Sequence, residues 1–190
     1  MIVLIGDSIF VRMNKSCPIP DSLSLATSGA SVSFLPNNPS FYKLIHTDYF
    51  KENPNHNHSN DVLCLLAGTN DFLKSVDVDD VKKSHRKLVN YCLRRFKHIV
   101  LCQIPPIPNL PVDRNETIRL FNRWLVTVYA QNPKVTVVNS FHPFLSEHTL
   151  PYPLVRYYEL TYPSGKTDLI HLNRDGLLIL RNIILSAIPA

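Results

Sequence analysis

The chain opens on Ile2-Val3-Leu4-Ile5-Gly6-Asp7-Ser8, an apolar run that ends abruptly in a polar turn. A continuous apolar run rich in β-branched residues is typical of a parallel strand that is covered on both faces. Similar apolar runs recur at residues 61–66, 98–102 and 135–138. These four stretches therefore predict the strands of one central sheet.

Helical patterns lie between these strands. Residues 78–96 bring apolar side chains to one face. A second helix is predicted from Asp113-Arg114-Asn115-Glu116, which has capping-box spacing, to Asn132-Pro133, and a third at residues 174–187. Strands that alternate with helices of this length predict an α/β fold with a mainly parallel sheet.

The bulk composition fits one folded domain. The 190 residues can bury a substantial core, and 45% of them are hydrophobic. No apolar run approaches the roughly 20 residues that a membrane helix needs. Because a strand begins at residue 2, we expect residues 1–190 to be a single domain cut from a longer chain.

The cysteines bear on the compartment. Cys17, Cys64, Cys92 and Cys102 show no metal-ligand spacing, and three of them lie in apolar segments, where a free Cys behaves as a small hydrophobe. We interpret them as reduced, which predicts an intracellular, cytoplasmic location. The net charge of +5 favours anionic partners without identifying one.

Two stretches are predicted to be irregular. Residues 34–60 are rich in Pro, Asn and His, and His56 and His58 have no further ligands spaced to complete a metal site, which favours a solvated loop. Residues 141–167 interleave Pro with Tyr and form either a packed loop or the wall and lid of an acyl pocket. His142 and His148 are weaker candidates for lining that pocket.

Three polar motifs adjoin the ordered elements. Gly6-Asp7-Ser8 and Gly68-Thr69-Asn70-Asp71 each follow a strand, and Asp168-Leu169-Ile170-His171 precedes the last helix. Ligands of open parallel sheets bind beyond the carboxyl ends of the strands. The three motifs are therefore expected to meet at one rim of the sheet.

Together the motifs supply the parts of a serine hydrolase. The Ser8 hydroxyl is a poor nucleophile unless a base such as His171 takes its proton, and Asp168 can fix the imidazole tautomer. The tetrahedral intermediate also needs hydrogen-bond donors, which the Ser8 and Gly29 backbone N–H groups and the Asn70 amide can provide.

Each motif also has a structural interpretation. Gly6-Asp7-Ser8 could be a capped strand-to-helix turn, and Asn70 a turn residue. Asp71 is expected to brace its loop rather than to touch substrate. Asp168 and His171 could be an exposed pair near a helix start. The occurrence of all three motifs in this order favours catalysis.

The motifs resemble the sequence blocks of the SGNH, or GDSL-type, hydrolase superfamily. Ser28-Gly29-Ala30 is similar to its second block, so the resemblance spans the whole chain. It implies a flavodoxin-like three-layer α/β/α fold and ester hydrolysis without metal or cofactor. It also implies Ser8 as nucleophile, Ser8, Gly29 and Asn70 as oxyanion donors, and Asp168 and His171 as acid and base. Ile9 replaces the Leu of the longer GDSL spelling, an apolar exchange that leaves the chemistry untouched.

Within that superfamily, three details look most like one group of esterase domains. They are Leu66–Asp71, Phe121–Leu125 and Ile170–Gly176, which resemble the esterase domain in the first-open-reading-frame protein of LINE-type retrotransposons. This resemblance implies a parent protein that handles nucleic acid and can meet membranes, with the acyl substrate open.

A cluster of cations stands on the helix predicted at residues 78–96 and at its exit, with no acidic residue inside the cluster. Its members are Lys82, Lys83, Arg86, Lys87, Arg94, Arg95 and Lys97. The cluster is either a solvated outer face or a contact surface for an anionic membrane or a nucleic acid.

The sequence thus predicts a serine esterase that forms an acyl-enzyme on Ser8 and releases it with water activated through His171. Acetyl or longer acyl esters, lipids included, are the expected substrates. Two alternatives stay open: a non-catalytic lipid- or nucleic-acid-binding module on the same fold, and a carbohydrate O-deacetylase that uses the same machinery.

Overall fold

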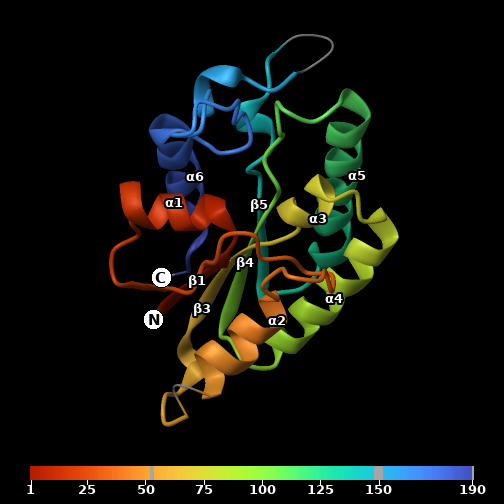
Figure 1. The fold of residues 1–190 in the computed structure, drawn as a ribbon. Helices are drawn as coiled ribbons and strands as arrows, with labels where there is room; N and C mark the ends of the chain where they lie inside the picture. The colour runs from red at the N-terminus through yellow and green to blue at the C-terminus, as the bar shows by residue number, and fades with distance from the viewer. Residues whose placement is uncertain (52–53, 148–151, 190) are drawn as a thin grey trace.

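A parallel sheet forms the centre of the computed structural model, which describes residues 1–51, 54–147 and 152–189. Five strands pair in the order β2-β1-β3-β4-β5. Figure 1 labels β1, β3, β4 and β5. Their bounds are Ile2–Gly6 (β1), Ser22–Ser24 (β2), Val62–Leu66 (β3), His98–Cys102 (β4) and Val135–Val138 (β5). All pairings are parallel, which confirms the predicted α/β class.

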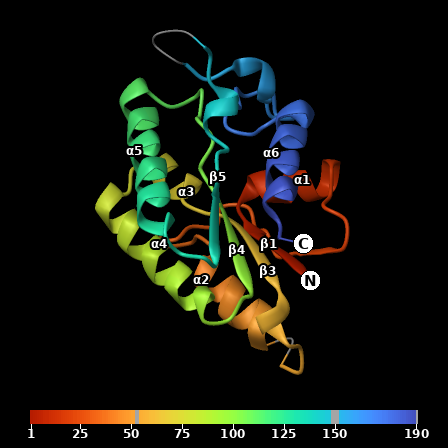
Figure 2. The same ribbon diagram turned by 180° about the vertical axis from the view of Figure 1, so that it is seen from behind.

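Helices cover both faces of the sheet (Figures 1 and 2). They are α1 (Ser8–Ser16), α2 (Phe41–Lys43), α3 (Thr69–Leu73), α4 (Val78–Leu93), α5 (Val112–Tyr129) and α6 (Arg174–Ala187). Alternate strand residues point to opposite sides because the side-chain period of a strand is two. Val3 and Leu63 therefore join the core under α4 and α5, and Leu4 and Cys64 join the core under α1 and α6. The three-layer arrangement is confirmed.

The second long helix begins differently from the prediction. Helix α5 starts at Val112 with Pro111 as its N-cap and no side-chain capping bond, so the predicted capping box at Asp113 is wrong. Pro suits this position because it has no N–H to leave unpaired. Asp113 lies in the first turn, where a carboxylate favours the helix dipole. Glu116 bonds instead to Arg119.

The described part of residues 34–60, which are 34–51 and 54–60, contains more regular structure than predicted. Helix α2 continues into a π-helix at Leu44–Lys51, and the two together bring Phe41, Ile45 and Tyr49 into the core. These three residues are four apart, which is helical spacing, but the surrounding Pro, Asn and His obscured it.

Residues 141–147 and 152–167 form short turns, with 3₁₀ helices at His142–Phe144 and Val155–Tyr157. Phe144 and Tyr158 are buried, so much of this stretch is packed loop. His148 lies outside the described residues. In the described residues, no helix has the length and apolarity needed to cross a bilayer.

Candidate active site

Ser8 stands where β1 ends and α1 begins. Asp7 is the N-cap of α1, and its carboxylate accepts the Ile9 N–H at 2.9 Å. Burial raises the pKa of Asp7, and the hydrogen bond from Ile9 opposes that shift. Because Ser8 is the first residue of the helix, its backbone N–H belongs to the turn that has no partner within the helix.

Backbone contacts bring the other motifs to the same rim. Gly6 lies opposite Leu66 in the β1–β3 register, and the Gly6 carbonyl accepts the Thr27 N–H at 2.9 Å. Gly68 then turns the chain with φ of 119°, where a Cβ would lie 2.9 Å from Ile104. Only glycine suits both the positive φ and this close approach.

Side chains at the start of α3 hold the second motif in place. The Asn70 amide donates to the Ala30 carbonyl at 2.9 Å, and an amide nitrogen has a second N–H to offer. The Asp71 carboxylate accepts the N–H groups of Val32 and Ser33 at 3.0 and 2.9 Å. Asp71 thus braces a loop, as expected.

Gly29 lies beside the Ala30 carbonyl that Asn70 contacts. Its φ is 80°, in the left-handed region that glycine adopts without strain. Its own carbonyl accepts a hydrogen bond from the Asn38 amide at 2.6 Å. The loop is therefore fixed on both sides of this residue.

The turn at residues 168–171 is held under strain. Leu169 has φ of 51°, which costs a non-glycine residue on the order of 1 kcal/mol or more. The Leu169 N–H donates to Glu159 at 2.9 Å, and the Leu169 carbonyl accepts from Asn109 at 3.2 Å. Because two other segments fix this backbone, the turn keeps the conformation that directs His171 toward Ser8.

The three predicted triad residues form one chain of hydrogen bonds. Ser8 Oγ lies 2.9 Å from His171 Nε2, and His171 Nδ1 lies 2.9 Å from each carboxylate oxygen of Asp168. Asp168 is fully buried, and burial raises its pKa. Hydrogen bonds from His171 and from the Ile170 N–H outweigh burial, and the net pKa of Asp168 is lowered. The carboxylate therefore stays ionised beside the imidazole.

Arg12 was missed from the sequence, and Tyr162 was predicted only as part of the segment 141–167, without its contact to His171. Arg12 Nη2 lies 3.5 Å from Asp168 Oδ2. Arg12 follows Ser8 by four residues on α1, and this one-turn spacing was an available signal. The Tyr162 ring meets the His171 ring edge-on, with centroids 5.8 Å apart. Nothing in the local sequence marks that contact, because it depends on how the preceding loop folds back.

A second group of titratable side chains lies just before β3, away from Ser8. Asp61 is fully buried and accepts hydrogen bonds from the Tyr49 hydroxyl and, at 2.7 Å, from His56 Nε2. His58 Nδ1 is 3.7 Å from the same carboxylate. His56 is exposed in a loop, as predicted, but the approach of both histidines to the buried Asp61 carboxylate was not foreseen. In the described part of the chain, this is the group whose ligand atoms, all within 4.8 Å, could hold a metal ion.

Comparison with known proteins identifies the class. Residues 4–177 match the GDSL-like Lipase/Acylhydrolase family, so the chain belongs to that family. A search of curated proteins found no significant match.

Solved structures share the fold. A GDSL-like lipase from Bacteroides thetaiotaomicron is 17% identical with a TM-score of 0.72, over 98% of this chain and 86% of that one. The OSK domain of Drosophila Oskar is 13% identical with a TM-score of 0.72, over 98% and 88%. A catalytic mutant of an acetylxylan esterase from Geobacillus stearothermophilus is 17% identical with a TM-score of 0.59, over 97% and 92%. At these identities the likeness shows the fold alone.

Proposed function

We propose that the protein is a serine esterase that hydrolyses carboxylic esters through Ser8, His171 and Asp168. The observation that carries this proposal is the continuous hydrogen-bond chain from Ser8 Oγ through the His171 ring to the buried Asp168 carboxylate. Membership of an acylhydrolase family supports the same chemistry.

Each residue has a defined part in the proposed reaction. His171 Nε2 takes the Ser8 proton while the Ser8 oxygen attacks the ester carbonyl, and Asp168 stabilises the imidazolium that forms. In this proposal, the Ser8 and Gly29 backbone N–H groups and the second Asn70 N–H donate hydrogen bonds to the oxyanion. The imidazolium then gives its proton to the leaving alcohol, and a water activated by His171 releases the acid.

The alternative is a non-catalytic binding module on the same fold, which the OSK domain of Drosophila Oskar shares. A fluorophosphonate probe separates the two functions, because only an activated serine is labelled. We expect one probe on the wild-type protein at Ser8 and none on Ser8→Ala. Labelling that persists in Ser8→Ala, or no labelling of a folded wild-type protein, would contradict the proposal.

The acyl group is proposed to range from acetyl to longer chains. A panel of nitrophenyl esters from acetate upward tests this range, and acetylated xylo-oligosaccharides test the O-deacetylase alternative that the acetylxylan esterase likeness suggests. We also propose an intracellular protein of the retrotransposon-esterase type. The four buried, free cysteines support the intracellular part of that proposal.

A further inference from the structure

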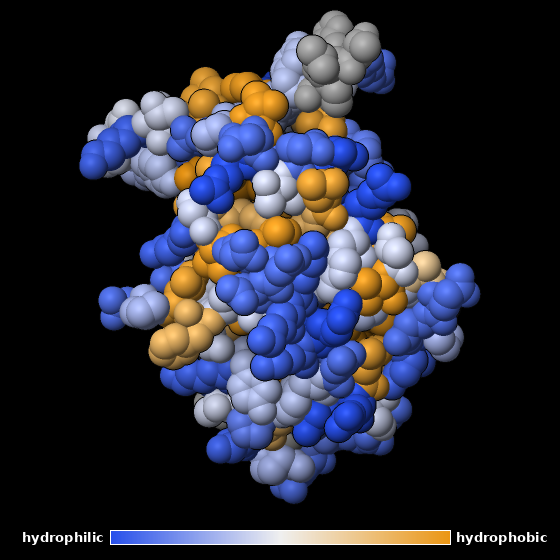
Figure 3. Space-filling view, turned by 90° about the vertical axis from the view of Figure 1, so that its right-hand side faces the viewer, coloured by the Kyte–Doolittle hydropathy of each residue, from blue (hydrophilic) through white to orange (hydrophobic). Residues whose placement is uncertain are grey.

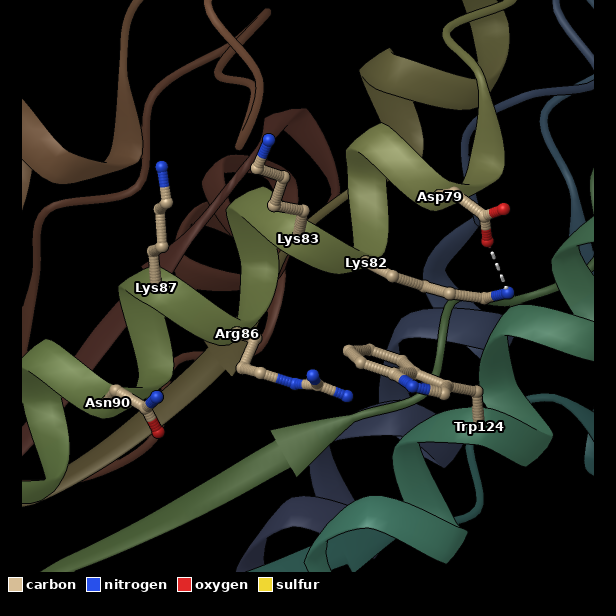
Figure 4. A pocket seen from close by; sticks show the side chains of 7 residues that line it. All are labelled: Asp79, Lys82, Lys83, Arg86, Lys87, Asn90 and Trp124. Atoms are coloured by element: carbon tan, nitrogen blue, oxygen red, sulfur yellow. Dashed lines mark hydrogen bonds and ion pairs between the residues drawn. The ribbon is translucent and has the colours of Figure 1, made fainter.

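A hollow of about 430 Å³ lies between α4 and α5. Trp124 of α5 forms one wall, and the side chains of α4 form the other. Figure 4 shows Lys82 and Arg86 reaching from α4 toward the Trp124 indole, while Lys83 and Lys87 point away from it. We call the side of α4 that carries Lys83 and Lys87 its outer ridge. We call this hollow the α4–α5 groove.

The Trp124 ring is held in place from below. Phe121 lies 5.4 Å from it and the buried His85 meets it edge-on at 6.1 Å, both measured between ring centroids. Burial lowers the pKa of His85 to about 4, so that ring is neutral at physiological pH. Trp124 itself is only partly buried, with the Arg86 guanidinium 5.5 Å from its ring centroid. The guanidinium lies over the indole, so a planar group that stacks on this face of Trp124 takes the place of Arg86.

The structure divides the predicted cluster of cations. Lys82 pairs with Asp79 at 2.9 Å, and Arg95 lies 3.7 Å above the Tyr91 ring. In the described residues, no carboxylate lies within ion-pair distance of Lys83 or Lys87, although Asp80 stands near both. The outer ridge of α4 therefore keeps positive charge that can meet an anion.

A second aromatic side chain lies across that ridge. Lys83 and Lys87 also line a hollow of about 330 Å³ whose opposite wall includes Phe34, which is 92% exposed. The ridge is thus flanked by Trp124 on one side and by Phe34 on the other. On this side of the molecule, apolar patches border hydrophilic surface (Figure 3).

From this arrangement we infer that α4, the α4–α5 groove and Phe34 bind single-stranded nucleic acid. Phosphates contact Lys83 and Lys87 on the ridge, and bases stack on Trp124 and Phe34. A positively charged track with aromatic platforms is how proteins bind single strands without reading sequence. A bilayer is disfavoured as the occupant because a flat surface cannot enter the groove that holds Trp124.

The experiment uses the single Trp of the chain as its reporter. A 12-nucleotide oligouridylate should quench the emission of Trp124 in a saturable way, and affinity should fall as salt rises. For a single strand, each cation that neutralises a phosphate contributes about 0.7 to the slope of log affinity against log salt. Lys83→Gln with Lys87→Gln should therefore reduce the slope by about 1.4.

A matched control removes two charges elsewhere on the same segment. Arg94→Gln with Lys97→Gln changes net charge equally at the far end of α4, and quenching and slope should stay close to wild type. Equal weakening by both double variants would mean that only overall charge matters, which would overturn the inference.

Two single variants test the groove itself. Trp124→Leu should bind a fluorescently labelled oligouridylate about tenfold more weakly by anisotropy, because stacking on one base is removed. Asp79→Asn removes the acidic side chain from the groove and should strengthen binding. If Trp124→Leu fails to fold, Asp79→Asn still tests the inference. An affinity for oligouridylate that does not rise in Asp79→Asn would contradict binding in the α4–α5 groove.

Two other anionic probes distinguish single-stranded nucleic acid from a polyanion without bases and from a lipid surface. Inorganic polyphosphate should bind in low salt without quenching Trp124, because it has no bases. If phosphatidylserine vesicles change the Trp124 emission and oligouridylate does not, the surface binds lipid and the inference is wrong.

Discussion

Two buried aspartates lie at different ends of the sheet, and each accepts a hydrogen bond from a histidine. Asp168 meets His171 at 2.9 Å beyond the end of β1, and Asp61 meets His56 at 2.7 Å just before β3. Burial raises the pKa of both carboxyl groups, and in both the hydrogen bonds prevail and lower it. A buried Asp–His hydrogen bond with a lowered Asp pKa therefore does not by itself identify an active site.

The surroundings of the two pairs differ. The second ring nitrogen of His171 meets the Ser8 hydroxyl, and the His171 side chain is 11% exposed. The His56 side chain is 40% exposed, and the Asp61 carboxylate also accepts the Tyr49 hydroxyl. The proposed active site is therefore distinguished by the Ser8 hydroxyl and by the N–H donors proposed for the oxyanion. The Asp–His pair alone does not distinguish it.

Loss of the charge on Asp168 should have the largest effect. Asp168→Asn removes the acceptor that fixes the His171 tautomer, so we expect kcat to fall about 10⁴-fold in nitrophenyl acetate hydrolysis. Asp61→Asn is the matched variant and should keep most of the activity. Equal losses of activity in the two variants would contradict the distinction between the pairs.

Asn70→Ala should have the next largest effect. Removal of one oxyanion donor lowers kcat by about 10²- to 10³-fold, while KM changes less because the donor acts in the transition state. The variant also loses the hydrogen bond to Ala30, so thermal melting must show a folded protein. A change confined to KM would make Asn70 a binding residue instead.

Asp61→Asn should reduce stability rather than activity. The folded-state pKa of Asp61 is lowered, so its contribution to stability is present above the ordinary pKa of 3.8 and is lost as the pH falls through the lowered value. Weakening the bonds to Tyr49 and His56 should cost on the order of 2 kcal/mol at neutral pH. For a domain of this size that lowers Tm by about 4–8 °C.

The pH dependence sharpens this test. Both Asp61→Asn and Asp168→Asn should flatten the loss of Tm between neutral and strongly acid pH, because each removes one lowered carboxyl pKa. Only Asp168→Asn should also lower kcat about 10⁴-fold. An acid dependence of Tm that is unchanged in Asp61→Asn would mean that its buried hydrogen bonds do not favour the ionised form.

The sequence predicted most of the sheet because β1, β3, β4 and β5 carry apolar runs. It missed β2, whose residues Ser22-Leu23-Ser24 pair only with β1 at the edge and need no such run. It also missed the helix at residues 41–51, whose three buried residues stand among residues typical of loops. The hydrophobic pattern is absent from β2 because it is an edge strand. It is hidden at residues 41–51 because polar residues surround the buried ones.

The sequence predicted those residues of the candidate site that belong to motifs at the ends of strands or at the start of a helix. Ser8, Asp168 and His171 are brought together as the sequence indicated, whereas their catalytic roles stay predictions. Contacts between distant segments were not predictable in the same way. Tyr162 reaches His171, and Tyr49 reaches Asp61, only once separate segments have packed.

The smallest effect is expected at the histidine of the second pair. His56 is partly exposed, so its bond to Asp61 is screened by solvent, and His56→Gln should lower Tm by no more than about 3 °C and leave activity unchanged. Because Tyr49 and His56 already donate to the Asp61 carboxylate, we expect micromolar Zn²⁺ to leave Tm unchanged in both proteins. A zinc-dependent rise in Tm that is present in wild type and absent in His56→Gln would show a metal site instead. The two Asp–His pairs would then differ in function as well as in surroundings, because Asp168–His171 would activate a serine and Asp61–His56 would bind a metal ion.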